Sequence, residues 1–249
     1  MSAFVLKIIA MITMVFDHIG YLVFGSVSFF NYIGRLAFPI FAFQISEGYI
    51  HTKNVWKYML RLFIFALISQ VPFAMFVSLV TGGGTWTNYI FTHLNIFFTL
   101  LLGLVSIYAY DKTERKRNAV LYVFAVALIG EIINVDYGFF GVIMIVLFYA
   151  LREKKALMSF SFIGLVAANL ALTIYDFLLN HYPNEMGLAF FRYLEAGVFN
   201  RVIISAVCTM LSVVVINLYN GKKGRDLKQI LYFFYPVHLV LIYVIWLIS

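Results

Sequence analysis

Ionisable and amide side chains stand inside long apolar runs of this sequence. Asp17 and His18 are adjacent late in the first run, while His93 and His238 fall in or near two other runs. A charged side chain at the centre of a membrane helix costs roughly 2.5–3.5 kcal/mol, so such residues usually face the protein interior and are functional. The set to be explained is Asp17, His18, Arg35, Glu47, Arg61, Gln70, His93, Asn95, Glu131, Asp176 and His238.

Asp17 and His18 are the pair that most strongly suggests a functional site. Adjacent positions of a helix point about 100° apart, so each side chain is expected to find its partner on another helix. One interpretation is a histidine that handles a proton while a carboxylate sets its tautomer or charge. The alternative is an ion pair or hydrogen bond that only ties helices together.

The second run contains Arg35 four residues before Pro39, which predicts a kinked helix. Arg35 alone could simply snorkel to the membrane interface. Glu47 lies near the other end of that run and can be solvated or can pair with Arg61.

Lys53, Lys57 and Arg61 form a small basic group between the second and third runs. The group can bind lipid head groups and set orientation, or it can form a phosphate-binding mouth, since Lys and Arg recognise phosphate well. Gln70 and Pro72 follow, and a proline there frees a backbone carbonyl that can line a cavity.

Two further polar pairs stand at helix positions. His93 and Asn95 enter the fourth run together. Tyr235 and His238 lie three positions apart around Pro236, so they share a helix face.

These residues must be positioned by membrane helices. Apolar residues make up 63% of the 249 residues and charged residues only 12%, against about 25% charged in soluble domains. A membrane span needs about 20 apolar residues, and an open row of strands cannot satisfy its backbone in lipid. We therefore expect one all-α transmembrane domain over residues 1–249, a bundle of about nine helices (eight to ten) at 4–24, 32–50, 57–80, 89–110, 117–134, 137–151, 156–179, 200–219 and 228–248.

Lys and Arg collect in every second break between these runs, at 51–57, 111–117, 152–155 and 221–228. The positive-inside rule then predicts an inner (plasma) membrane protein with a cytoplasmic N-terminus and an extracytoplasmic C-terminus. The stretch 186–199 is interpreted as an interfacial helix on the outer side, and the glycines at 82–84 as a flexible outer loop. The net charge of +7 accordingly reflects orientation in the bilayer and not nucleic-acid binding.

Metal chemistry is not expected. The five histidines show no HExxH or related spacing, and the lone Cys208 lies inside an apolar run. Thiolate sites need several ligands, so Cys208 is expected to serve helix packing.

Several segments resemble the TraX family in order along nearly the whole chain. They are LKIIAMITMVFDHIG (6–20), GRLAFPIFAFQISEG (34–48), HTKNVWKYMLRLFIFALISQVPF (51–73), HLNIFFTL (93–100), DYGFFGV (136–142) and YPVHL (235–239). The family is named for a conjugative-pilus protein that acetylates the N-terminus of pilin, and it resembles larger polytopic acyltransferases of the heparan type. The resemblance implies functional roles for Asp17, His18, Arg35, Phe38, Pro39 and Phe41.

The resemblance implies a membrane acetyltransferase that uses cytoplasmic acetyl-CoA and modifies an amine or hydroxyl of an extracytoplasmic acceptor, either a pilin N-terminus or a glycan. His18 would be the general base, steadied by Asp17, and His93 or Asn95 would donate to the thioester oxygen. Direct transfer and a transient acyl-histidine both remain open. The candidate catalytic residues are Asp17, His18, Arg35 and His93, and those for substrate or cofactor binding are Lys53, Lys57, Arg61, Gln70, Asn95, Glu47, Tyr235 and His238.

Two other classes of protein remain alternatives. A proton-coupled transporter would also place acids and histidines in the membrane, although the halves of this chain show no internal repeat. A non-enzymatic assembly factor would need larger loops than these breaks provide. The oligomeric state does not follow from the sequence.

Overall fold

The computed structural model describes residues 1–24, 28–82, 85–181, 198–225 and 228–248. Within these ranges the chain is helical and contains no strand, which confirms the all-α prediction. The helices are α1 (Ala3–Phe24), α2 (Phe29–Gly34), α3 (Ala37–His51), α4 (Val55–Thr81), η1 (Trp86–Tyr89), α5 (Ile96–Lys112), α6 (Lys116–Ile132), α7 (Gly138–Ala150), α8 (Lys155–His181), α10 (Val198–Asn217) and α11 (Lys228–Ile248). The expected interfacial helix at 186–199 falls almost wholly outside the described residues.

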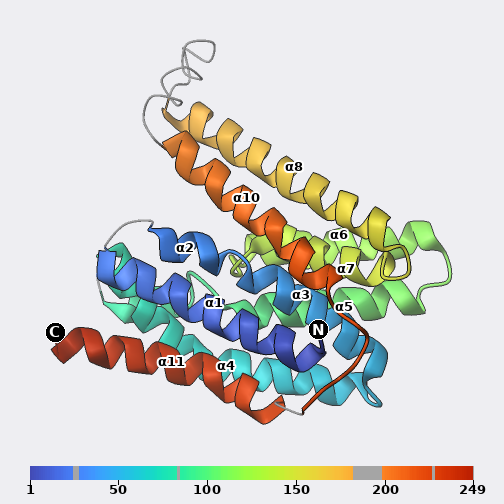
Figure 1. Cartoon of the computed structure of the whole chain (residues 1–249), viewed down its shortest axis with the longest axis horizontal. Coiled ribbons are helices and arrows are strands. Elements are labelled where there is room, and N and C mark those ends of the chain that lie inside the picture. The colour runs from blue at the N-terminus through green and yellow to red at the C-terminus, as the bar shows by residue number, and fades with distance from the viewer. Residues whose placement is uncertain (25–27, 83–84, 182–197, 226–227, 249) are drawn as a thin grey trace.

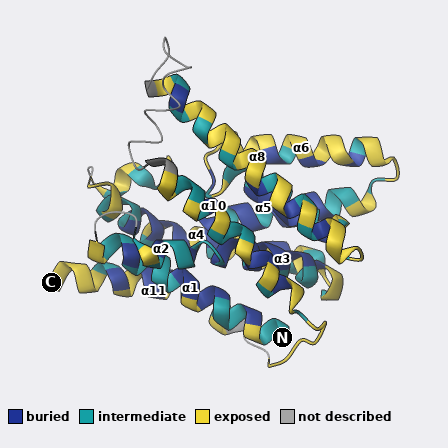
Figure 2. Cartoon of the chain, turned by 45° about the horizontal axis from the view of Figure 1, so that its top comes forward, coloured by how far each residue is buried: buried dark blue, intermediate teal, exposed yellow. Residues whose placement is uncertain are grey.

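Five of the described helices are long and apolar enough to cross a membrane, namely α1, α4, α8, α10 and α11. Large apolar side chains such as Leu121 on α6, Phe160 on α8 and Trp246 on α11 are exposed. Figure 2 shows exposed positions along α6, α8 and α11. Lipid covers such surfaces. The chain is therefore an integral membrane protein. The number of crossings stays a prediction, because α7 is shorter and α5 and α6 have 17 residues each. The orientation in the membrane stays a prediction as well.

The second predicted span is not one helix. It is divided into α2 and α3 by a turn at Arg35 and Leu36, so the expectation of a continuous, kinked helix over 32–50 is wrong. Pro39 explains the break. It has no N–H to donate to the carbonyl of Arg35, and its ring would clash with that carbonyl in a continuous helix.

The fourth predicted span begins later than expected, at Ile96 and not near residue 89. Asn95 caps α5 by accepting the Phe97 N–H at 3.0 Å, and its amide donates to the Ala66 carbonyl and to Gln70 Oε1, each at 2.7 Å. The Gln70 amide in turn donates to the carbonyls of residues 90 and 93. Irregular backbone is tolerated at membrane depth only when protein groups satisfy it in this way.

Three of the basic breaks come together at one end of the bundle, which we call the basic end. Asp111 accepts hydrogen bonds from Tyr49 and Tyr149, each at 2.8 Å, and so joins the ends of α3, α5 and α7. The fourth break joins them through the N-terminal residues, because the Ala3 N–H donates to the Lys222 carbonyl at 2.8 Å. This gathering agrees with the alternation of charge along the sequence.

Four of the described helices pack against α1, the helix that carries Asp17 and His18. This helix contacts α2, α3, α4 and α11, and α11 also packs along α4. In Figure 1, α8 and α10 lie side by side and lean away from the rest of the bundle. This arrangement leaves space on two sides of the polar residues of α1.

Candidate functional site

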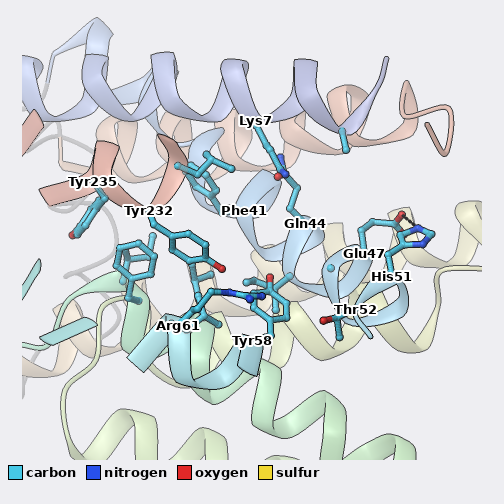
Figure 3. Close-up of a pocket in the computed structure, with 18 of the residues that line it drawn as sticks. Lys7, Phe41, Gln44, Glu47, His51, Thr52, Tyr58, Arg61, Tyr232 and Tyr235 are labelled. Carbon is cyan, nitrogen blue, oxygen red and sulfur yellow. Dashed lines mark ion pairs between the residues drawn. The ribbon is translucent and has the colours of Figure 1, made fainter. Parts of the chain in front are cut away.

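A cavity of about 370 Å³ runs inward from the basic end, between α1, α3, α4, α5 and α11. We call it the inner cavity. Charged and polar residues lie at its mouth, and Figure 3 shows several of them around the space. Its deep end is apolar and aromatic, and is lined by Met14, Phe41, Ile96, Phe97, Leu100, Phe234 and Tyr235.

The basic residues that line the inner cavity are Lys7, Arg61 and Lys223. The Arg61 guanidinium lies 5.7 Å from the centre of the Tyr58 ring and forms a hydrogen bond with Tyr232. The expected basic group is thus only partly brought together, because Lys53 and Lys57 are exposed and do not line this cavity. Lys7 and Lys223 replace them, since backbone hydrogen bonds join residues 3–4 to 222–223.

Glu47 also lies at the mouth, where its carboxylate is 3.7 Å from His51 Nε2 (Figure 3). It accepts a hydrogen bond from Tyr219 as well. Burial and the nearby Glu47 charge and hydrogen bond raise the pKa of Tyr219 to about 12, so this phenol keeps its proton. Glu47 is therefore paired within the basic end by residues other than Arg61.

His18 and His238 meet beyond the deep end of the inner cavity. His18 Nδ1 lies 2.7 Å from His238 Nε2, and the rings are nearly parallel with centroids 4.9 Å apart. Tyr235 and Phe234, which line the cavity, contact the His238 ring at centroid distances of 5.6 and 4.8 Å. One layer of aromatic rings thus separates the histidine pair from the cavity.

Asp17 makes a different set of contacts. The Asn31 amide donates to the Asp17 backbone carbonyl at 2.7 Å and to its carboxylate at 3.3 Å. Arg35 interacts electrostatically with Asp17 and with Asp136, and donates to the Tyr21 hydroxyl at 2.7 Å. Neighbouring positions on α1 therefore serve two separate networks, as the 100° step between them predicts.

A second cavity of about 650 Å³ lies on the other side of these networks, between α3, α7, α8 and α10. We call it the outer cavity, because the residues of α8 and α10 that line it lie mostly in the halves of these helices away from the basic end. Arg35, His93 and Tyr137 line it together with a polar row on α10, Arg201, Ser205 and Thr209. Residues four apart share a helix face, so this row is one stripe.

The floor of the outer cavity beside Arg35 is held in an uncommon backbone conformation. Tyr137 has a φ of 62°, and its ring stacks on Phe38 with centroids 3.7 Å apart. A bulky residue at positive φ is strained, and such strain collects at functional sites. The Arg35 Nε atom is buried beside this floor without a hydrogen-bond partner among the described residues.

The predicted residues Gln70, Asn95 and His93 have partners other than the histidine pair. Gln70 and Asn95 satisfy the backbone before α5, so the Asn95 amide is committed to that network. His93 stacks on Phe73 at 5.4 Å and lines the outer cavity, away from the histidine pair. No group of three metal-ligating side chains occurs among the described residues.

Sequence reasoning missed Tyr21, Asn31, Asp136 and Tyr137 as members of the site. Asn31 and Tyr21 are ordinary polar residues of apolar runs, and nothing in their spacing singles them out. Asp136 and Tyr137 did carry a signal, because they begin the matching segment DYGFFGV at 136–142. Asp136 falls in the predicted break at 135–136 and Tyr137 begins the predicted span 137–151, so neither was assigned to the site.

The TraX protein family model matches residues 2–246, so the chain belongs to the TraX family. It is 27% identical over 248 residues to a probable fimbrial assembly protein FimC (serogroup H1) of Dichelobacter nodosus, covering 97% of this chain and 94% of that protein. It is also 27% identical over 183 residues to the uncharacterized protein RP591 of Rickettsia prowazekii, covering 70% of this chain and 66% of that protein. No solved structure gives a significant match.

Proposed function

We propose that this protein is a membrane acetyltransferase that takes acetyl-CoA from the basic end and acetylates an amine or hydroxyl in the outer cavity. One observation carries the proposal. The inner and outer cavities approach, from opposite sides, a layer of the bundle that contains the His18–His238 pair together with Asp17 and Arg35, whose charges interact electrostatically. Such a layer suits transfer of a small group across most of the membrane without passage of the whole donor.

The inner cavity fits the donor chemically. Lys7, Arg61 and Lys223 suit the phosphates of coenzyme A. Gln44 lines the cavity and has a buried amide nitrogen without a hydrogen-bond partner among the described residues. This nitrogen can donate to an amide carbonyl of the pantetheine arm. The aromatic deep end suits the thioester and a short acyl chain.

His18 is the proposed general base. The acceptor nitrogen or oxygen attacks the thioester carbonyl carbon, the new C–N or C–O bond forms, and the C–S bond breaks. His18 takes the proton of the acceptor and returns it to the leaving sulfur. Arg35 lines the outer cavity and can stabilise negative charge on the carbonyl oxygen. Asn95 does not serve this role, because its amide already donates to the Ala66 carbonyl.

The acceptor is proposed to be extracytoplasmic, a pilin N-terminus or a glycan. The description of the Dichelobacter relative as a probable fimbrial assembly protein favours a pilus-associated acceptor. The same description favours a second candidate, a non-enzymatic assembly factor. A non-enzymatic assembly factor would not need a cavity that binds phosphate. Binding of acetyl-CoA therefore distinguishes the acetyltransferase from the assembly factor.

Titration of acetyl-CoA into the purified protein in detergent tests the proposal, with dephosphorylated and deacetylated analogues for comparison. We expect micromolar binding that weakens when the phosphates are removed. A folded protein that does not bind acetyl-CoA would contradict the acetyltransferase proposal and favour the assembly factor, or a transporter if proton flux is then found.

A further inference from the structure

A chain of two hydrogen bonds leads from the backbone of α11 to His18. The Phe234 carbonyl lies 2.8 Å from His238 Nδ1, and His238 Nε2 lies 2.7 Å from His18 Nδ1. The two rings are inclined by only 9° with centroids 4.9 Å apart. Two nitrogens at 2.7 Å are closer than stacked ring faces can come, so the rings meet edge to edge in nearly one plane.

This chain fixes the proton positions. A carbonyl oxygen only accepts, so His238 Nδ1 must carry a hydrogen. A neutral imidazole has a single N–H, so His238 Nε2 is the acceptor and His18 Nδ1 is the donor. The lone pair of His18 is then on Nε2. Both rings are expected to be neutral because Phe76, Phe234 and Tyr235 surround them, and an unpaired charge among apolar rings is costly.

We infer that His238 is a positioning residue that holds His18 in the tautomer with a free Nε2 lone pair. The sequence suggested Asp17 for this task, but the Asp17 side chain is bonded to Asn31. When His18 Nε2 takes a proton, its Nδ1–H keeps the bond to His238 Nε2, and the ring orientation is retained. A second imidazole from the last helix thus acts where many enzymes use a carboxylate.

The tautomer itself does not depend on the proposed function, although its use in catalysis does. Nitrogen-15 NMR of the full chain with labelled histidine in detergent micelles distinguishes the two neutral tautomers. His18→Gln and His238→Gln identify the two signals by their loss, and His51→Gln serves as a control that leaves both in place. We expect His18 with its proton on Nδ1 and His238 with its proton on Nδ1. A His18 proton on Nε2 would overturn the inference.

Enzyme kinetics then test the consequence. His238→Leu removes the acceptor, and we expect kcat for acetyl transfer to fall at least tenfold with the KM for acetyl-CoA unchanged. His238→Gln supplies a side-chain oxygen near the position of Nε2 and should recover part of kcat. Equal kcat in the parent and both variants would refute the positioning role. Absence of transfer in the parent, with the expected tautomer, would instead refute the proposed function and leave the tautomer intact.

Discussion

His18 and His238 lie 220 positions apart in the sequence, yet their ring nitrogens are 2.7 Å apart at the centre of the bundle. This contact joins the first and last helices beside the closed end of the inner cavity. The histidine pair lies between the inner cavity on one side and Arg35 with the outer cavity on the other. The predictions below test each part of this arrangement.

Arg61 and Lys57 are one helical turn apart on α4, but only Arg61 lines the inner cavity. We expect Arg61→Gln to weaken binding of acetyl-CoA by about ten- to a hundredfold, since a charge-assisted contact to phosphate is worth about 1.5–3 kcal/mol. The matched change Lys57→Gln should leave the Kd unchanged. Calorimetric titration in detergent measures both, and equal weakening by the two variants would mean that the basic end attracts the ligand only through its overall charge.

Phe97 and Tyr235 close the deep end of the inner cavity with an edge-to-face contact at 5.4 Å. Phe97→Ala should open space for longer acyl groups. Each additional methylene that is accommodated is worth about 0.8 kcal/mol, or about fourfold in kcat/KM. Comparison of acetyl-, butyryl- and hexanoyl-CoA measures this effect.

Phe65→Ala is the control for that change, because Phe65 packs against Phe97 at 6.2 Å but does not line the cavity. It should keep the parental preference for acetyl-CoA. An unchanged acyl preference in a folded, active Phe97→Ala variant would show that these rings do not limit chain length.

Gly34 allows α2 to approach α1 closely. A Cβ atom at Gly34 would lie 2.8 Å from the Asp17 Cα atom, a backbone atom that cannot move aside cheaply. We expect Gly34→Ala to lower the stability by about 1–3 kcal/mol, as overpacking does, and to lower the Tm in detergent.

Gly164 on α8 provides the matched control, since among the described residues no atom beyond its chain neighbours and its own helical backbone would lie within 4 Å of a Cβ at this position. Gly164→Ala should keep or slightly raise the Tm, because alanine is favoured over glycine within a helix by about 0.5–1 kcal/mol. Similar Tm values for the two variants would contradict the close α1–α2 contact.

The sequence predicts the helices well where apolar runs end in charged residues, as at Lys112 and Lys116. It fails where a helix ends inside an apolar run. The break at Arg35 and the late start of α5 at Ile96 depend on Pro39 and on the Gln70–Asn95 pair, and hydrophobicity does not change at either place.

The sequence indicates which residues belong to the site better than it indicates which of them contact each other. Intramembrane polarity singled out His18 and His238, but only the packing of α1 beside α11 makes them partners. In the same way, Lys7 and Lys223 are separate surface lysines in the sequence, and the backbone contact between residues 3–4 and 222–223 brings them to one cavity mouth. Long-range packing of this kind leaves no local pattern in the sequence.

The most direct test of the central claim is acetyl transfer by the parent and by His18→Ala, each reconstituted in liposomes with acetyl-CoA. A peptide with a free N-terminal amine and an amino sugar serve as acceptor probes, and mass spectrometry detects the acetylated product. We predict product with the parent and none with His18→Ala, although both proteins bind acetyl-CoA with the same Kd. Equal product from the two proteins would contradict the assignment of His18 as the base that serves acetyl transfer.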